Sequence, residues 1–217
     1  MSGGGILPPR NSMQSGAMAQ SPEDLDKALR AEADQLLGSG LREVLSDYGE
    51  VHVVGSYALH LMVWRDLDIT IFRAQQDREQ FFRLGGRIAE LLKPHRMSYR
   101  DEFIDRTEKN PTGLYWGVYL GDARKGAWKI DIWTVSPDDP KAAHLGTQSL
   151  RERLSDNSRA IILRIKSQLW SHPEYRRTFS SQDIYDAVLD HDVSDIPGFQ
   201  GYLRGKGVVI STENMSG

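Results

Sequence analysis

The most informative part of the sequence is VHVVGSYALHLMVWRDLDITIF, Val51 to Phe72, because it places two aspartates in an apolar setting. The run VHVVG (51–55) predicts a short strand, and LDITIF (67–72) predicts a second one. An ionised carboxylate that leaves water for an apolar strand costs several kcal/mol unless a partner compensates it. Asp66 and Asp68 also repel each other, so this pair of residues requires a compensating group.

Side chains two positions apart on a strand point to the same face. Asp66 and Asp68 therefore project together, whereas Leu67 between them points toward a core. Asp131 interrupts a second apolar strand, AWKIDIWTV (127–135), in the same manner. If these two strands are neighbours, the three aspartates form one cluster.

Divalent cations stabilise such a cluster. Mg²⁺ prefers hard oxygen ligands and is usually held by one or two carboxylates together with substrate phosphates and waters. A bound cation also removes the like-charge repulsion that would otherwise raise the pKa of one aspartate. Three aspartates are sufficient to hold two ions about 3.5–4 Å apart.

Gly55 and Ser56 supply a complementary anion-binding turn. Glycine at the end of a strand allows a ligand to approach the backbone closely. The predicted short helix at 56–63 presents unpaired N–H groups at its N-terminus, and Ser56 adds a hydroxyl. A turn of this kind facing a carboxylate–metal cluster suits a nucleoside triphosphate with Mg²⁺.

These residues carry a family resemblance. Gly55-Ser56, nine intervening residues, and Asp66-Leu67-Asp68-Ile69 resemble the signature of the polymerase-β-like nucleotidyltransferase superfamily. Asp131, in Lys129-Ile130-Asp131-Ile132, is similar to the third carboxylate of that family. The resemblance covers residues 41–135 and implies an α/β (α+β) fold, with a nucleotidyltransferase-like mixed sheet flanked by helices.

The resemblance also implies a role for each residue. Gly55 and Ser56 would contact the triphosphate of an NTP such as ATP, and Asp66 and Asp68 would ligate two Mg²⁺ ions. Asp131 would ligate the catalytic ion and help to deprotonate the acceptor hydroxyl. The implied reaction transfers a nucleoside monophosphate to a hydroxyl of a small molecule, a protein or an RNA end, and pyrophosphate leaves.

The rest of the chain predicts a helical C-terminal part. Three segments are expected: a disordered tail at 1–20, the α/β core at 21–137, and a helical segment at 138–217 that packs on the core. The sequence beyond Gly198 gives weak signals. The expected elements outside the central stretch are a helix from Ser21 interrupted at 38–40, helices at 77–92, 157–170 and 181–189, and strands at 97–105 and 114–121.

Composition limits the partners. The formal net charge is −3, which disfavours long nucleic acid as a ligand. The chain has no cysteine, which excludes thiolate catalysis and Cys-based zinc sites and fits a cytoplasmic location. No apolar run reaches the roughly 18 residues of a transmembrane helix, so no membrane partner is expected.

Plainer interpretations apply to several residues. Asp66 or Asp68 could pair with Arg65 at an exposed loop end, and Asp131 could pair with Lys129 or Arg73. Gly85-Gly86 predicts a close-packing point in helix 77–92. The aromatic residues are interpreted as strand packing: Tyr115, Trp116, Tyr119, Trp128 and Trp133. The basic residues outside the aspartate motif could bind the phosphates of an acceptor, but a solvated face is the favoured interpretation: Arg124, Lys125, Lys129, Arg159, Arg164, Lys166, Arg176 and Arg177.

A rival function belongs to another class. The same fold can serve as a non-catalytic nucleotide-binding module or as a toxin–antitoxin-like interaction module. Degenerate copies of this kind typically lose one carboxylate. The presence of Asp66, Asp68 and Asp131 together therefore favours catalysis.

Overall fold

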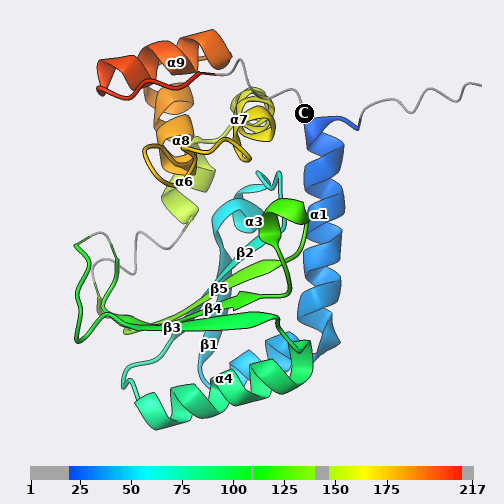
Figure 1. Cartoon of the computed structure of the whole chain (residues 1–217), viewed down its shortest axis with the longest axis vertical. Helices are drawn as coiled ribbons and strands as arrows, with labels where there is room; N and C mark the ends of the chain where they lie inside the picture. The colour runs from blue at the N-terminus through cyan, green and yellow to red at the C-terminus, as the bar shows by residue number, and fades with distance from the viewer. Residues whose placement is uncertain (1–19, 109, 140–146, 212–217) are drawn as a thin grey trace, which may run out of the picture.

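The computed structural model describes residues 20–108, 110–139 and 147–211, and it confirms the mixed α/β class (Figure 1). A five-stranded sheet has the order β1-β2-β5-β4-β3. The strands are β1 (Glu50–Val54), β2 (Asp66–Phe72), β3 (Arg96–Asp101), β4 (Gly113–Tyr119) and β5 (Lys129–Val135). The helices are α1 (Pro22–Leu36), α2 (Arg42–Ser46), α3 (Gly55–Leu59), α4 (Arg78–Leu92), α6 (Gln148–Arg153), α7 (Asp156–Leu169), α8 (Ser181–Asp190) and α9 (Ile196–Gly205).

The centre of the sheet brings the two aspartate-bearing strands together. β2 and β5 are parallel neighbours, whereas the β1–β2, β3–β4 and β4–β5 pairs are antiparallel. Asp68 lies opposite Asp131 in the register, and Asp66 lies opposite Lys129. The expectation that the strand of Asp131 adjoins the strand of Asp68 is therefore confirmed.

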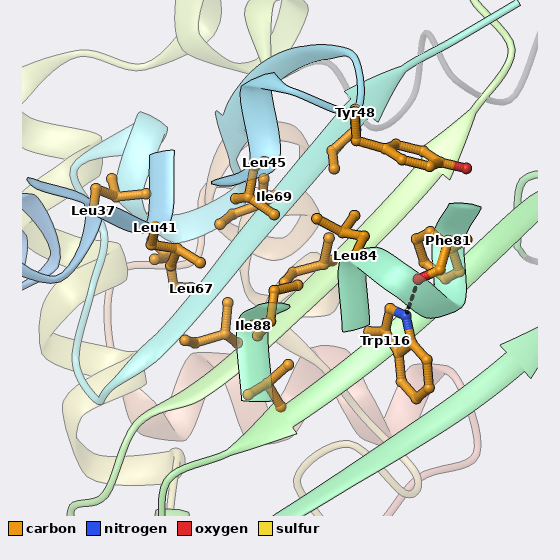
Figure 2. Packing of buried hydrophobic residues seen from close by; sticks show 14 of the residues in the cluster. Leu37, Leu41, Leu45, Tyr48, Leu67, Ile69, Phe81, Leu84, Ile88 and Trp116 are labelled. Carbon is orange, nitrogen blue, oxygen red and sulfur yellow. Dashed lines mark hydrogen bonds between the residues drawn. The ribbon is translucent and has the colours of Figure 1, made fainter. Parts of the chain in front are cut away.

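The first core lies between one face of the sheet and α1, α2 and α4 (Figure 2). Apolar residues of β2, such as Leu67 and Ile69, meet the buried side of the helices there. Gly85 of α4 lies so close to Trp116 that an added Cβ would be 2.7 Å from the indole ring, whereas no described atom lies within 4 Å of the same position at Gly86. The predicted close-packing point is thus Gly85 alone.

A second core joins the C-terminal helices to the loop that follows α3. Leu59, Leu61 and Val63 pack in one cluster with buried residues of α7, α8 and α9. The loop is also tied to α1, because the buried Asp26 carboxylate accepts a 2.8 Å hydrogen bond from the Met62 backbone N–H. Figure 1 shows α6–α9 on the opposite side of the sheet from α4.

Two predicted boundaries are wrong for local reasons. The helix expected at 56–63 ends at Leu59, because His60 adopts a left-handed conformation with φ of 59° and the following apolar residues enter the second core. The strand expected at 97–105 ends at Asp101, whose carboxylate accepts a 3.0 Å hydrogen bond from the Phe103 backbone N–H and turns the chain.

The sequence beyond Gly198 did not predict a helix, but α9 spans Ile196–Gly205. Asp195 caps α9 by accepting a 2.8 Å hydrogen bond from the Gly198 N–H, and Pro197 lies in the first turn, where its missing N–H is tolerated. Phe199 and Leu203 of α9 are buried. Of the tail predicted at 1–20, residues 1–19 lie outside the described residues. In the described ranges, no helix is both long enough and apolar enough to cross a bilayer.

Candidate metal centre

The three predicted carboxylates converge on the face of the sheet opposite α4. One oxygen from each of Asp66, Asp68 and Asp131 lies within 4.8 Å of the others. The period-two geometry of β2 and β5 and their parallel register produce this cluster directly. Asp131 is buried, and Asp66 and Asp68 are partly buried.

The cluster fits a hard divalent cation. It offers only carboxylate oxygens, the ligand type that Mg²⁺ prefers. Burial, reinforced by repulsion from Asp66 and Asp131, raises the pKa of Asp68 to about 7. Among the described residues, none donates a hydrogen bond to Asp68, so its oxygens are available to a ligand. A cation bound here would offset both the burial of the Asp68 carboxylate and its repulsion from Asp66 and Asp131.

Gly55 is required by the position of Asp68. Its φ of +62° is left-handed, and a Cβ at this residue would lie 2.2 Å from the Asp68 Oδ2. Any side chain would therefore displace the carboxylate. The Asp68 carboxylate is thus the close neighbour of the Gly55 backbone, and contact of Gly55 with a triphosphate stays a prediction.

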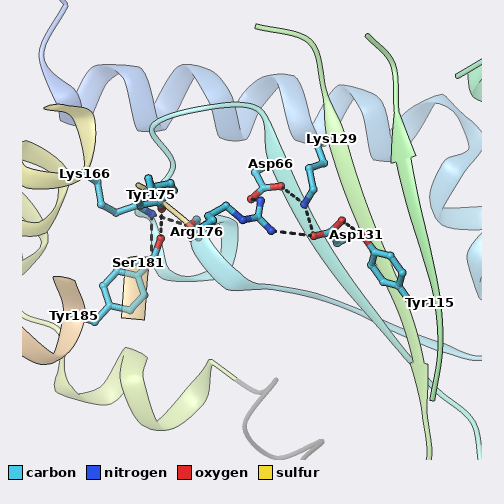
Figure 3. A network of polar contacts seen from close by, with 10 residues as sticks. Asp66, Tyr115, Lys129, Asp131, Lys166, Tyr175, Arg176, Ser181 and Tyr185 are labelled. Atoms are coloured by element: carbon cyan, nitrogen blue, oxygen red, sulfur yellow. Dashed lines mark hydrogen bonds and ion pairs between the residues drawn. The ribbon is translucent and has the colours of Figure 1, made fainter. Parts of the chain in front are cut away.

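A buried lysine bridges two of the carboxylates (Figure 3). The Lys129 ammonium donates to Asp66 Oδ1 at 3.1 Å and also to Asp131 Oδ2. Burial alone would lower the pKa of Lys129, but the two carboxylates outweigh it and raise that pKa, so the side chain is charged. The interpretation of Lys129 as a solvated hairpin residue is wrong, and the alternative that pairs it with Asp131 is confirmed.

Two other pairing alternatives are wrong. Arg65 forms a two-pronged ion pair with Glu32, at 2.6 and 2.8 Å, and not with Asp66 or Asp68. Arg73 donates to the Tyr48 carbonyl and to Gln80, far along β2 from the aspartates.

Arg176 approaches the centre from the segment between α7 and α8. Its guanidinium lies 3.5 Å from Asp66 Oδ2 and 3.8 Å from Asp131 Oδ2, and it lies over the Trp64 ring at 5.8 Å. The predicted solvated role is therefore wrong for Arg176. Its side chain is still 46% exposed, so it has room to move.

Lys166 is a buried cation beside the candidate site, and the interpretation of it as a solvated residue is wrong. Its side chain is 1% exposed, and its ammonium donates to the Ser56 hydroxyl at 2.8 Å, the Leu61 carbonyl at 2.7 Å and the Tyr185 hydroxyl at 3.2 Å (Figure 3). A signal was available, because Lys166 lies four residues after Ile162 and three before Leu169, on the buried side of α7. The buried lysine holds the Ser56 hydroxyl beside the turn at Gly55.

A cavity of about 520 Å³ adjoins the centre. It lies between the ends of β1, β2 and β5 and the C-terminal helices α6 and α8, and its lining includes Gly55, Asp68, Thr70, Trp133 and Tyr185. Trp133 thus borders the cavity and does not only pack within the sheet. This volume is within the range of small-molecule sites.

No protein-family profile matches the chain, and no curated protein is significantly similar to it.

Proposed function

We propose that the protein is a Mg²⁺-dependent nucleotidyltransferase that transfers a nucleoside monophosphate from an NTP to a hydroxyl acceptor. The observation that supports this most is the convergence of Asp66, Asp68 and Asp131 beside the glycine turn at Gly55. The resemblance to the polymerase-β-like superfamily, which rests on the same residues, supports the reaction class.

The chain's own residues divide into two groups in this proposal. Asp66 and Asp68 would hold Mg²⁺, which supplies positive charge to the reacting phosphate, and Asp131 beside them would act as the base. The Ser56 hydroxyl would bind the triphosphate, and the buried Lys166 ammonium, which donates to it, would hold it in position beside the turn. Arg176 would exchange its weak carboxylate contacts for phosphate oxygens, because its long ion-pair distances and partial exposure make it easy to displace.

The proposed reaction balances without a further reactant. The acceptor oxygen forms a bond to the α-phosphorus, and the bond from that phosphorus to the bridging oxygen of the β-phosphate breaks. Pyrophosphate leaves, and the Asp131 carboxylate accepts the proton of the hydroxyl. The cavity that contacts Asp68 and Trp133 provides space for a nucleoside or a small acceptor.

Calorimetric titration of each Mg²⁺–NTP tests the binding half of the proposal. The wild-type protein should bind one NTP in a metal-dependent manner, and Asp66→Asn/Asp68→Asn should lose that binding. Asp47→Asn is the matched control, because Asp47 pairs with Arg87 at an exposed site. Absence of metal-dependent NTP binding in the wild-type protein would contradict the proposal.

Transfer is tested separately with the NTP that binds. Incubation of α-phosphate-labelled NTP with panels of small molecules, proteins and RNA ends should yield one labelled product and an equal amount of pyrophosphate. Tight binding with no transfer to any acceptor class would favour the non-catalytic nucleotide-binding module.

A further inference from the structure

We propose that the centre holds a single divalent cation, at Asp66 and Asp68, and that the Lys129 ammonium occupies the place of a second cation beside Asp131. This inference rests on the proposed function and differs from the two-ion arrangement that the family resemblance implies. It makes Lys129 a fixed positive charge of the active site.

The strands fix the position of Lys129. Lys129 and Asp131 lie on the same face of β5, two residues apart, and the register sets Lys129 opposite Asp66. Its side chain is 9% exposed, in contrast to 46% for Arg176, the other cation at this site. Of the two, Arg176 is free to leave when an ion arrives, whereas Lys129 is enclosed by the sheet and its neighbours.

Asp131 is already occupied by protein donors. Its Oδ2 accepts from Lys129, and its Oδ1 accepts a 2.7 Å hydrogen bond from the Tyr115 hydroxyl. Tyr115 is buried, with Trp133 packed against its ring at 5.0 Å and Arg100 over it at 4.2 Å, so this donor is held in place. By contrast, no described residue donates to Asp68, on the adjacent strand.

Electrostatics therefore separate the two possible ion positions. An ion bridging Asp66 and Asp131 would compete with the buried Lys129 ammonium for Asp131 Oδ2, and would lie within a few ångströms of that like charge. An ion between Asp66 and Asp68 would instead use Asp68, to which no described residue donates, and Asp66 Oδ2, which the displaceable Arg176 contacts at 3.5 Å, while Lys129 keeps its contact with Asp66 Oδ1. One ion and one ammonium together neutralise the three carboxylates, as −3 is offset by +2 and +1.

Counting bound Mn²⁺ by electron paramagnetic resonance tests the inference. The protein is saturated with the α,β-methylene analogue of the NTP that binds, and free Mn²⁺ is measured during titration. Wild-type protein should bind one Mn²⁺ in total per bound nucleotide analogue, after a protein-free control has been used to subtract the Mn²⁺ held by excess free analogue. Lys129→Met, which keeps the side-chain length and removes the charge, should bind two. Two Mn²⁺ ions about 3.5–4 Å apart would also show a spin-coupled spectrum.

Matched variants complete the experiment. Lys206→Met removes a lysine that pairs with Asp183 away from the centre, and it should bind one ion. Lys129→Arg keeps the positive charge and should also bind one ion. If Lys129→Met proves unstable, the ion count of Lys129→Arg still tests whether the charge at this position excludes a second ion.

The outcomes separate the two proposals. Two ions in the wild-type protein, or one ion in a folded Lys129→Met protein, would overturn the role of Lys129 and leave the proposed function standing. No nucleotide-dependent Mn²⁺ binding in the wild-type protein would overturn the proposed function itself.

Discussion

Replacement of Gly55 by alanine should remove divalent-ion binding without unfolding the protein. The alanine Cβ would lie 2.2 Å from Asp68 Oδ2, and such contacts essentially never fall below 3.0 Å, so the carboxylate would have to retreat by about 0.8 Å. Mg²⁺ requires its ligands near 2.0–2.1 Å in nearly ideal octahedral geometry. A displacement of this size therefore removes Asp68 as a ligand.

The effect on stability can be separated from the effect on the site. Alanine in a left-handed conformation costs about 1–2 kcal/mol. Gly207 has a φ of +77°, and no described atom lies within 4 Å of the position of its missing Cβ. Gly207→Ala therefore carries the same backbone strain as Gly55→Ala, with no contact to the carboxylates.

Two measurements on both variants check this reasoning. Urea unfolding should show that each variant loses about 1–2 kcal/mol of unfolding free energy. Mn²⁺ titration with the bound NTP analogue should show affinity loss of about ten-fold or more, or about 1.4 kcal/mol, in Gly55→Ala alone. Equal Mn²⁺ affinity in Gly55→Ala and Gly207→Ala would refute the role assigned to Asp68.

Three further predictions concern pH and packing. Folding raises the pKa of Asp68 from 3.8 to about 7, so the folded state binds the proton of this carboxyl more tightly than the unfolded state does. The urea midpoint of the metal-free protein should therefore fall as the pH rises from 4 to 7. The Asp68→Asn variant should show a smaller fall over the same pH range. Thr70→Val should raise the unfolding free energy by about 1 kcal/mol, since the buried Thr70 hydroxyl has no partner among the described residues. Thr134→Val should lower it by about as much, because the Gln76 Oε1 loses the hydrogen bond that the Thr134 hydroxyl donates. Gly85→Ala should lower the thermal midpoint because its Cβ meets Trp116, and Gly86→Ala should raise the unfolding free energy by about 0.5–1 kcal/mol; the opposite order would contradict the packing of α4.

The carboxylate cluster was predictable because strand alternation is a strong local constraint. Asp66 and Asp68 had to share a face once 67–72 was assigned as a strand, and Asp131 had to point away from its isoleucine neighbours. That β2 pairs with β5 was predicted from the family resemblance alone, because the alternation of side chains along a strand does not indicate which strands are neighbours. The mixed α/β class followed from the order of the predicted elements.

The burial of the cations at the site was not predicted, for a physical reason. Lys129 shares the face of Asp131 on its strand, and Lys166 lies on the apolar side of its helix, but a lysine side chain is normally solvated, and both were interpreted in that way. Burial of each ammonium becomes acceptable only when its acceptors are present. For Lys166 these include Ser56 and Tyr185, which lie far away in the sequence.

The contact between Lys166 and Ser56 spans 110 residues, and so does the contact between Arg176 and Asp66. At a typical synthesis rate of about 5–20 residues per second, the ribosome needs roughly 5–22 s to pass from one partner to the other. A nascent chain therefore exposes its glycine turn and first two aspartates for seconds before either cation exists. Completion of the site therefore waits for the synthesis of α7 and the segment that follows it, and a chain released before residue 166 would carry the carboxylates without Lys166 or Arg176.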